Sequence, residues 1–398
     1  MSSAEQIETG AEAQPSDQEL ARRRSRFRRF AYRVALILAP AHVYVGWSLV
    51  PDLTVDPTIK ALGYGVLAVS ALLIPFGTMA RLFIGNDGAV KRMVWAGSVT
   101  MGWFSSVVIF TLLRDLVLLV AGRPDWAATS AFVVLVASVL VTLVGFFNAR
   151  RVAKVVRVTV PLTTLPKSLD GFTIAQITDI HVGPTIKGNY VRGIVDRVNS
   201  LGADVVAITG DVVDGKVHEL TDDTAPLGNL RARYGSFIVT GNHEYYSGAD
   251  EWIDEFRRLG LQPLVNEHVV IGHNGENLVL AGVNDYSAAR VHRSHKSDPE
   301  AALQGSPNGS PKILLAHQPR SAHAAAEAGF DLQLSGHTHG GQFWPWNHFV
   351  RMQQPFTAGL RRLGALWVYT SRGTGYWGPP KRFGAPSEIT LITLSAAA

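Results

Sequence analysis

His337 and His339 stand one residue apart in the stretch "SGHTHGG", near the end of a chain of 398 residues. Imidazole nitrogens at this spacing are typical of metal sites, because several ligands must reach the same ion. Other side chains that can bind metal end four earlier apolar runs of the chain. They are Asp179 and His181 in "TDIH", Asp211 and Asp214 in "GDVVDG", Asn242 and His243 in "GNHE", and His317 in "AHQP".

Each of these five stretches follows a run rich in β-forming residues, so we predict that the polar side chains lie at strand ends. Residues two apart in a strand point from the same face, which would let Asp179 and His181, and likewise His337 and His339, enter one site. The carboxyl ends of strands carry the ligand sites of α/β sheets, and glycines let the backbone turn sharply there. We interpret other histidines as surface or packing residues: His218, His268, His273, His292, His295, His323 and His348.

The composition narrows the kind of metal site. The chain contains no cysteine, which excludes disulfides and thiolate ligands. A mixed set of nitrogen and oxygen ligands suits Mn²⁺, Fe or Zn²⁺ better than Ca²⁺. The net charge of +5 is accounted for by seven arginines in "ARRRSRFRRFAYR" near the N-terminus. That cluster predicts contact with anionic lipid or orientation in a membrane, and no nucleic-acid partner is expected.

Long apolar runs fall almost entirely before residue 150. After a disordered basic tail (1–30), we predict a transmembrane region (31–149) with four helices, because four apolar segments each approach the ~20 residues needed to cross a bilayer. These segments are 34–50, 61–79, 93–113 and 127–147. Pro40, His42 and Pro51 make the first segment the weakest, and an export signal is the alternative interpretation of it.

Basic residues predict the orientation of these helices. The N-terminal arginines, the link with Arg81, Lys91 and Arg92, and the stretch "NARRVAKVVR" should all lie in the cytoplasm, together with everything after residue 150. The sequence thus predicts a multi-pass protein of the cell (inner) membrane with a cytoplasmic catalytic part. The neighbours Arg114 and Asp115 mark either an interfacial continuation of the third segment or an intramembrane ion pair.

From about residue 155 the pattern changes to short β-rich runs that alternate with helical stretches such as "YVRGIVDRVNSL" and "DEWIDEFRRLG". This alternation predicts an α/β domain, residues 150–398, in which sheets are flanked by helices. No internal repeat is visible in the sequence.

The order D-x-H, G-D-x-x-D, G-N-H-E, H and G-H-x-H resembles the calcineurin-like metallophosphoesterase superfamily from about residue 155 to the C-terminus. The ending "SRGTGYWGPPKRFGAPSEITLITL" is similar to that of its membrane-associated bacterial branch, which resembles the transmembrane metallophosphoesterases. The resemblance implies two packed β-sheets flanked by helices and two divalent ions (Mn, Fe or Zn). It implies Asp179, His181, Asp211 and His339 as ligands of one ion, and Asp211, Asn242, His317 and His337 as ligands of the other.

The same resemblance implies a hydrolase acting on phosphoric ester bonds. Two nearby cations would generate a bridging hydroxide that attacks phosphorus and would neutralise charge on the phosphoryl oxygens. His243, oriented by Asp214, would face the substrate as the second part of the catalytic machinery. In its protonated form it would donate a proton to the departing alkoxide.

Two departures from relatives bear on the substrate. Serine/threonine phosphoprotein phosphatases of this superfamily have arginines where this chain has Gly215 and Thr240, which argues against phosphoprotein hydrolysis. Arg372, Lys381 or Arg382 could supply a phosphate clamp instead.

The stretch "QFWPWNHFVRMQQPF", with Trp344 and Trp346, is predicted to rim the site at the lipid headgroups, and the alternative is a loop that packs on its own domain.

Three hypotheses of function remain. The first is a membrane-bound dimetal phosphoesterase for a phosphodiester or phosphomonoester, with a lipid or lipid-linked substrate as one candidate. The second is a tethered phosphatase for soluble phosphomonoesters or phosphoproteins. The third, a metal-binding sensor or transporter without turnover, is disfavoured because every catalytic position is present. A nuclease is disfavoured because no basic stripe runs through the soluble domain. The sequence leaves the substrate, the native metals and the oligomeric state open.

Overall fold

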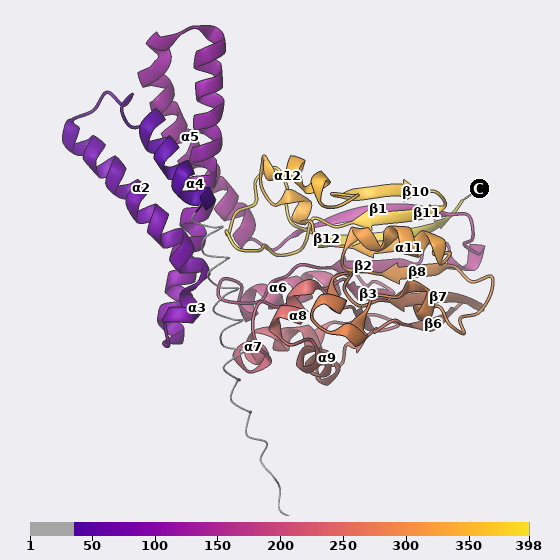
Figure 1. Cartoon of the computed structure of the whole chain (residues 1–398). Coiled ribbons are helices and arrows are strands. Elements are labelled where there is room, and N and C mark those ends of the chain that lie inside the picture. The colour runs from indigo at the N-terminus through magenta and orange to yellow at the C-terminus, as the bar shows by residue number, and fades with distance from the viewer. Residues whose placement is uncertain (1–35, 398) are drawn as a thin grey trace, which may run out of the picture.

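The computed structural model describes residues 36–397, which form a bundle of apolar helices beside a larger α/β body (Figure 1). The predicted disordered tail, its arginine cluster and the first two residues of the first apolar segment lie outside this range.

Three helices of the bundle are long and apolar enough to cross a membrane. They are α2 (Pro57–Thr78), α4 (Asp87–Ala121) and the continuous stretch Pro124–Arg150, which comprises the 3₁₀ turn η1 (Pro124–Trp126) and α5 (Ala127–Arg150). The first predicted segment differs: its described part is the shorter apolar helix Leu36–Ser48. The described residues therefore support three of the four predicted spanning helices, since a helix of this length falls short of ~20 residues.

Helix α4 is longer than the predicted segment 93–113 at both ends. Its 35 residues measure about 52 Å, whereas the hydrocarbon core of a bilayer is about 30 Å thick. No proline interrupts it before Gly122, which ends it in the left-handed conformation. The charged residues Asp87, Lys91 and Arg92 lie at its start, and the helix is longer than a bilayer crossing requires.

The contact between α2 and α4 depends on two glycines. A Cβ atom on Gly97 would lie 2.7 Å from the Cα of Gly77 and 2.7 Å from the carbonyl oxygen of Leu73. Small residues of this kind let transmembrane helices approach closely. The two helices can therefore pack at this level only because neither carries a side chain there.

Arg114 is paired within the bundle. Its side chain is only 3% exposed and forms ion pairs with Asp52 and Asp115, while its guanidinium also donates to Ser130 and to the carbonyl oxygen of Ala127. The ion pair is observed, and α4 continues beyond it to Ala121, so the structure contains features of both sequence interpretations. Arg114 thus connects α4 to the segment before α2 and to the start of α5.

The α/β body contains two six-stranded sheets. The first has the order β1-β12-β2-β3-β4-β5, with β1 (Lys154–Leu162), β12 (Glu388–Ala396), β2 (Thr173–Ile177), β3 (Val205–Ile208), β4 (Ser236–Ile238) and β5 (Gln262–Pro263). The second has the order β10-β11-β9-β8-β7-β6, with β10 (Gly359–Leu363), β11 (Leu366–Thr370), β9 (Leu332–Ser335), β8 (Lys312–Leu315), β7 (Glu276–Gly282) and β6 (Glu267–His273). The runs predicted to precede the five polar stretches are the strands β2, β3, β4, β8 and β9.

The two sheets pack face to face, as the resemblance implied. Val205 and Ala207 of β3 share one core with Ile313 and Leu315 of β8. Val206, between the first two, belongs instead to the core on the outer face of the first sheet. This alternation follows from the two-residue period of a strand and shows why such runs are apolar throughout.

Short helices cover the outer faces of both sheets (Figure 1). The first sheet is covered by α6 (Gly188–Asn199), α7 (Val217–Thr224) and α9 (Ala249–Arg258), and the second by α10 (Pro299–Ala302) and α11 (Ala322–Glu327). Two further short helices are α8 (Asn242–Ser247) and α12 (Trp346–Phe349). The helical stretches predicted at 190–201 and 250–260 correspond to α6 and α9.

A buried lysine joins the α/β body to the helix bundle. Lys381 is 2% exposed, and its ammonium group donates to the carbonyl oxygen of Gly102 and to the hydroxyls of Ser106 and Thr142. A Cβ atom on Gly145 would lie 2.6 Å from the Cγ of Lys381, so the glycine makes room for the lysine. The body therefore contacts α4 at Gly102 and Ser106 and α5 at Thr142 and Gly145.

The glycine contact predicts the effect of a single substitution. Replacing Gly97 with valine should separate α2 from α4 and lower the stability of the purified protein by ~1–3 kcal/mol, as overpacking does. Thermal unfolding in detergent measures this change. Gly65→Val is the control, because its Cβ would meet nothing within 4 Å on the same bundle. Equal melting temperatures for both variants would contradict the prediction.

Candidate metal centre and catalytic site

The predicted ligands lie just beyond the carboxyl ends of five strands. β2 ends at Ile177 before Asp179, β3 before Asp211, β4 before Asn242, β8 before His317 and β9 before His337. Because β2, β3 and β4 are parallel neighbours and β8 and β9 are parallel neighbours in the facing sheet, all five ends meet at one edge of the sandwich. The structure thus brings the sequence-predicted residues together.

The reason for their convergence differs from the one predicted. Asp179, His181, Asp211, His337 and His339 lie outside the strands and have φ between 51° and 70°. They are five of the eight non-glycine residues with positive φ in the described part of the chain. Their side chains therefore converge through left-handed turns, and strand alternation does not explain it. Backbone of this kind costs roughly 1–3 kcal/mol per residue and concentrates at functional sites.

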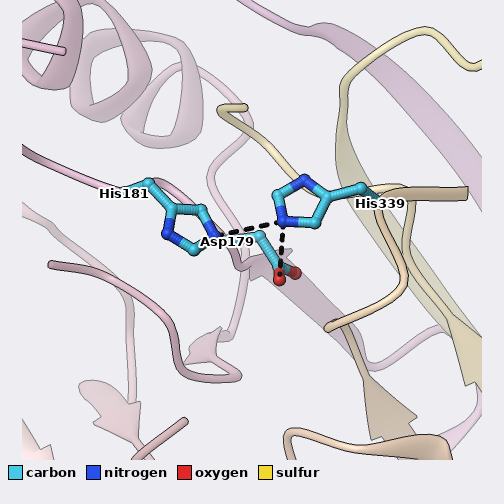
Figure 2. A group of neighbouring side chains, drawn as sticks. All are labelled: Asp179, His181 and His339. Atoms are coloured by element: carbon cyan, nitrogen blue, oxygen red, sulfur yellow. Dashed lines mark hydrogen bonds and ion pairs between the residues drawn. The ribbon is translucent and has the colours of Figure 1, made fainter. Parts of the chain in front are cut away.

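Asp179, His181 and His339 form the first ligand cluster, in which the candidate ligand atoms lie within 4.8 Å of one another (Figure 2). The two Nε2 atoms of the histidines are 3.1 Å apart, and Nε2 of His339 is 3.4 Å from Oδ1 of Asp179. Figure 2 shows both rings pointing toward the space beside this carboxylate. Two lone-pair nitrogens and a carboxylate oxygen facing one space suit a divalent cation.

A second cluster contains Asp211, His317 and His337. Oδ2 of Asp211 is 3.1 Å from Nε2 of His317, which is 3.2 Å from Nδ1 of His337. The same Oδ2 is 3.8 Å from Nε2 of His181 in the first cluster. Oδ1 of Asn242 is buried without a hydrogen-bond partner. A buried polar atom of this kind requires a partner, and a cation held by this cluster would provide one, so the residues fit a pair of ions that share Asp211.

The surroundings of His337 and His339 keep both imidazoles neutral. Burial and the neighbouring His317 lower the pKa of His337 to about 3. Burial and the adjacent Arg382 hold the pKa of His339 well below its ordinary value. Neutral imidazole has a free lone pair, which is the form that binds metal.

His243 and Asp214 form a close pair beside the clusters. Nδ1 of His243 is 2.5 Å from Oδ1 of Asp214, which also lies 3.1 Å from Nδ1 of His181. Burial opposes the charged form of His243, but the hydrogen bond to Asp214 and the charge of Asp211 outweigh it and raise the pKa of His243 to about 9. Nε2 of His243 lies 4.0 Å from Oδ2 of Asp211, so the ring touches the ligand cluster while its other nitrogen is engaged.

Glu244 is a site residue that the sequence analysis missed. Its buried carboxylate accepts hydrogen bonds from the backbone N–H groups of Gly241, Asp211, Val212 and Val213. Burial and the nearby Asp211 raise the pKa of Glu244 to about 7. Its place directly after "GNH" was the available signal, but a backbone-binding role leaves no trace in residue spacing.

The predicted substrate residues occupy different surroundings. Trp344 stacks on Phe110 of α4, and Nε1 of Trp346 donates to Ser105 of the same helix. Arg372 is half-buried and forms an ion pair with Glu388. The aromatic segment therefore packs against the helix bundle as well as on its own domain.

Lys381 and Arg382 are not available as the phosphate clamp that the sequence allowed. The ammonium group of Lys381 is used within the bundle, as described above. Arg382 is 1% exposed, and its guanidinium donates to carbonyl oxygens of Gly375, Arg372 and His339 and to Nδ1 of His339. Both cations are buried because they position the chain, which corrects the earlier hypothesis for these two residues.

A cavity of about 250 Å³ opens beside His243. Its lining includes Asp214, Lys216 and Tyr246 from the α/β body and Arg81 from the helix bundle. Arg81 entered the sequence analysis only as evidence of orientation, because nothing in its local sequence connects it with a residue more than 130 positions away.

Comparisons with known proteins agree with the geometry. The family described as calcineurin-like phosphoesterase matches residues 172–341. The chain is 42% identical over 282 residues to a bovine (Bos taurus) "transmembrane protein with metallophosphoesterase domain", covering 68% of this chain and 63% of that protein. The zebrafish (Danio rerio) protein of the same description is 38% identical over 271 residues, which are 66% of this chain and 62% of that one. The chain thus spans less than two thirds of the length of these two relatives.

An uncharacterized metallophosphoesterase from Campylobacter jejuni matches over nearly the whole length. It is 31% identical over 379 residues, covering 92% of this chain and 98% of that protein. The similarity therefore includes the helix bundle as well as the α/β body.

The shared position of Asp211 predicts how metal content responds to substitution. Asp211→Asn should lower bound metal from about two ions per chain to fewer than one, because both ions lose a ligand. His337→Ala should remove about one ion. Elemental analysis of the purified protein measures both, with the exposed Asp254→Asn as control. Retention of two ions by Asp211→Asn would refute the shared carboxylate.

Proposed function

Because the chain belongs to the calcineurin-like metallophosphoesterases, we propose that it hydrolyses a phosphoric ester with two divalent ions, Mn, Fe or Zn, as cofactors. The observation that carries this proposal is the pair of ligand clusters that meet at Oδ2 of Asp211. Asp179, His181 and His339 would hold one ion, and Asn242, His317 and His337 the other, with Asp211 shared. The chemistry that two such ions supply when bound is Lewis-acid activation of water and neutralisation of phosphoryl charge.

The residues around the clusters have separate tasks in this proposal. His243 is held by Asp214 in its protonated form and donates that proton to the oxygen of the leaving group. Glu244 binds the backbone of the loop that carries Asp211 and so fixes the shared carboxylate. Without the proton from His243, an alkoxide would leave slowly.

The chain is a membrane protein, as its three apolar helices and its similarity to proteins described as transmembrane indicate. We propose that the α/β domain begins near residue 150 after a transmembrane region from residue 31. The basic residues Arg81, Lys91 and Arg92 at one end of the bundle support a cytoplasmic catalytic domain at the inner membrane.

The substrate we propose is a lipid or lipid-linked phosphoester. Trp344 and Trp346 contact α4, and the same segment leaves Phe349 and Met352 52% and 82% exposed. Exposed aromatic and apolar side chains next to a membrane helix favour insertion among lipid headgroups. They support a path by which an amphiphilic phosphoester reaches the metal centre from the bilayer.

The proton-donor role predicts a dependence on the leaving group. His243→Ala should lower kcat by roughly 10²-fold for an alkyl phosphoester, which is a typical contribution of a general acid. The loss should be much smaller for nitrophenyl esters, whose leaving group departs without a proton. Steady-state kinetics on both substrates with Mn²⁺ measures this, and elemental analysis of the same samples checks metal content. Equal losses on both esters, or loss of metal from the variant, would contradict the assigned role.

The lipid proposal predicts a selective loss. Phe349→Ser with Met352→Ser should lower hydrolysis of a phospholipid in vesicles by about tenfold, because apolar contact with the bilayer is removed. Hydrolysis of a small soluble diester by the same protein should stay within a few-fold. Val270→Ser, an exposed apolar residue of β6, is the matched control. Unchanged hydrolysis of both substrates would favour a soluble phosphoester.

A further inference from the structure

The cavity beside His243 joins the two parts of the chain. Arg81 belongs to the short helix α3 (Ala80–Phe83), which directly follows the membrane helix α2. Its Nη1 lies 3.1 Å from Oε2 of Glu219 in α7, at a separation of 138 residues in the sequence. Figure 1 shows α3 at the end of the bundle nearest to α7. A residue from the membrane end of the chain thus lines the wall of the catalytic cavity.

Gly215 makes room for this guanidinium. A Cβ atom on Gly215 would lie 3.4 Å from Nη2 of Arg81 and 2.8 Å from Oε2 of Glu219. Any larger side chain at position 215 would compete with the ion pair for the same space. Because Gly215 has no side chain, the guanidinium of Arg81 from the helix bundle can occupy the adjacent space.

The cavity wall carries more positive than negative charge. Arg81 is 46% exposed at its side chain, and Glu219 is its partner. Lys216 is also exposed on the lining, and no carboxylate among the residues 36–397 lies within ion-pair distance of its ammonium group. The carboxylate of Asp214 is already engaged by two histidines. An anion that entered the cavity would meet two exposed cations and the edge of His243.

Other basic side chains near the metal centre bind groups outside the cavity. Lys381 and Arg382 donate to the helix bundle and to backbone carbonyls, and Arg372, which pairs with Glu388, is not part of the cavity lining. Arginine presents several N–H donors in a planar fork that matches phosphate oxygens. Of the basic residues around His243 in the described structure, Arg81 and Lys216 are thus the ones placed to meet a substrate phosphate.

The level of Arg81 follows from helix packing. Gly77 of α2 contacts Gly97 of α4, which lies five residues, or about 8 Å, before Gly102. Arg81 lies four residues after Gly77 and directly follows α2, a helix that is long and apolar enough to cross a membrane. Arg81, Lys91 and Arg92 are basic residues at this end of α2 and α4, and basic residues that flank apolar helices are expected at the membrane surface. We therefore expect Arg81 close to the lipid headgroups.

We propose that Arg81, assisted by Lys216, is a substrate-binding residue whose guanidinium binds non-transferred oxygens of a phosphoester held at the membrane surface. This inference rests on the proposed phosphoesterase function and adds its substrate clamp. The clamp is split between the juxtamembrane helix α3 and the α/β body, so the helix bundle completes the binding site as well as anchoring it.

The test compares Arg81→Gln with Glu219→Gln in the full-length, Mn²⁺-loaded protein. Both substitutions break the same ion pair, but only the first removes the cation. Arg81→Gln should weaken equilibrium binding of inorganic phosphate by about tenfold or more and raise KM for bis(4-nitrophenyl) phosphate similarly, with kcat within about threefold. Glu219→Gln should leave both quantities within about threefold. Melting temperatures identify any variant whose fold has changed.

The outcomes separate the inference from the proposed function. Equal effects of the two substitutions, or phosphate binding that is independent of Arg81, would overturn the clamp. A wild-type protein that hydrolyses no phosphoester, but whose phosphate binding still requires Arg81, would refute the proposed function and leave the clamp standing. A larger loss for a phospholipid in vesicles than for the soluble diester supports a lipid phosphate as the ligand, whereas equal losses support a phosphoester of either source.

Discussion

The carboxylate of Asp211 is the interaction on which the rest of the site depends. Its Oδ2 lies between the two ligand clusters, and its backbone N–H is bound by Glu244. Gly241 must lack a side chain, because its Cβ would lie 2.2 Å from Oδ1 of Asp211. Gly210, in a left-handed turn, would bring a Cβ within 2.6 Å of the nitrogen of Gly241. Gly210 and Gly241 are therefore required because the loops that follow β3 and β4 approach each other closely around the carboxylate of Asp211.

That crowding has an energetic consequence. Five predicted ligands adopt left-handed backbone, and at roughly 1–3 kcal/mol each this strain is comparable to the whole stability of a typical domain. Neighbouring hydrogen bonds offset part of it: the N–H of His337 donates to Asp179, and that of His181 to the carbonyl oxygen of Asp211. Ions that bind only the folded site would stabilise it further. A constellation held at this cost is difficult to explain by packing alone.

The sequence predicted the site residues correctly where a metal-binding residue type directly followed an apolar strand pattern. Strand ends could be located from apolar runs, and each run ended in the residue type that the site required. The left-handed turns could not be predicted, because aspartate and histidine, although enriched in this conformation, adopt it in a small minority of cases. Glu244 was missed because it binds backbone, and the length of α4 was underestimated because charged residues near its start hide a continuous helix. Arg81 depended on how two distant parts of the chain pack, which local spacing does not encode.

Two consecutive residues connect the membrane helices to the metal centre. Lys381 donates its ammonium protons to α4 and α5, and the N–H of Arg382 donates to the carbonyl oxygen of Gly145. The guanidinium of Arg382 then binds His339, a predicted metal ligand. Burial lowers the pKa of Lys381 to about 8, and buried cations are tolerated only when their donors are satisfied. Because the ammonium group of Lys381 is satisfied across the interface, rotation of the α/β body away from the bundle would leave this buried cation unpaired, whereas the guanidinium of Arg382 would keep its partners within the body. The Lys381 contacts therefore favour the orientation observed, in which Arg81 of the helix bundle lines the cavity beside His243.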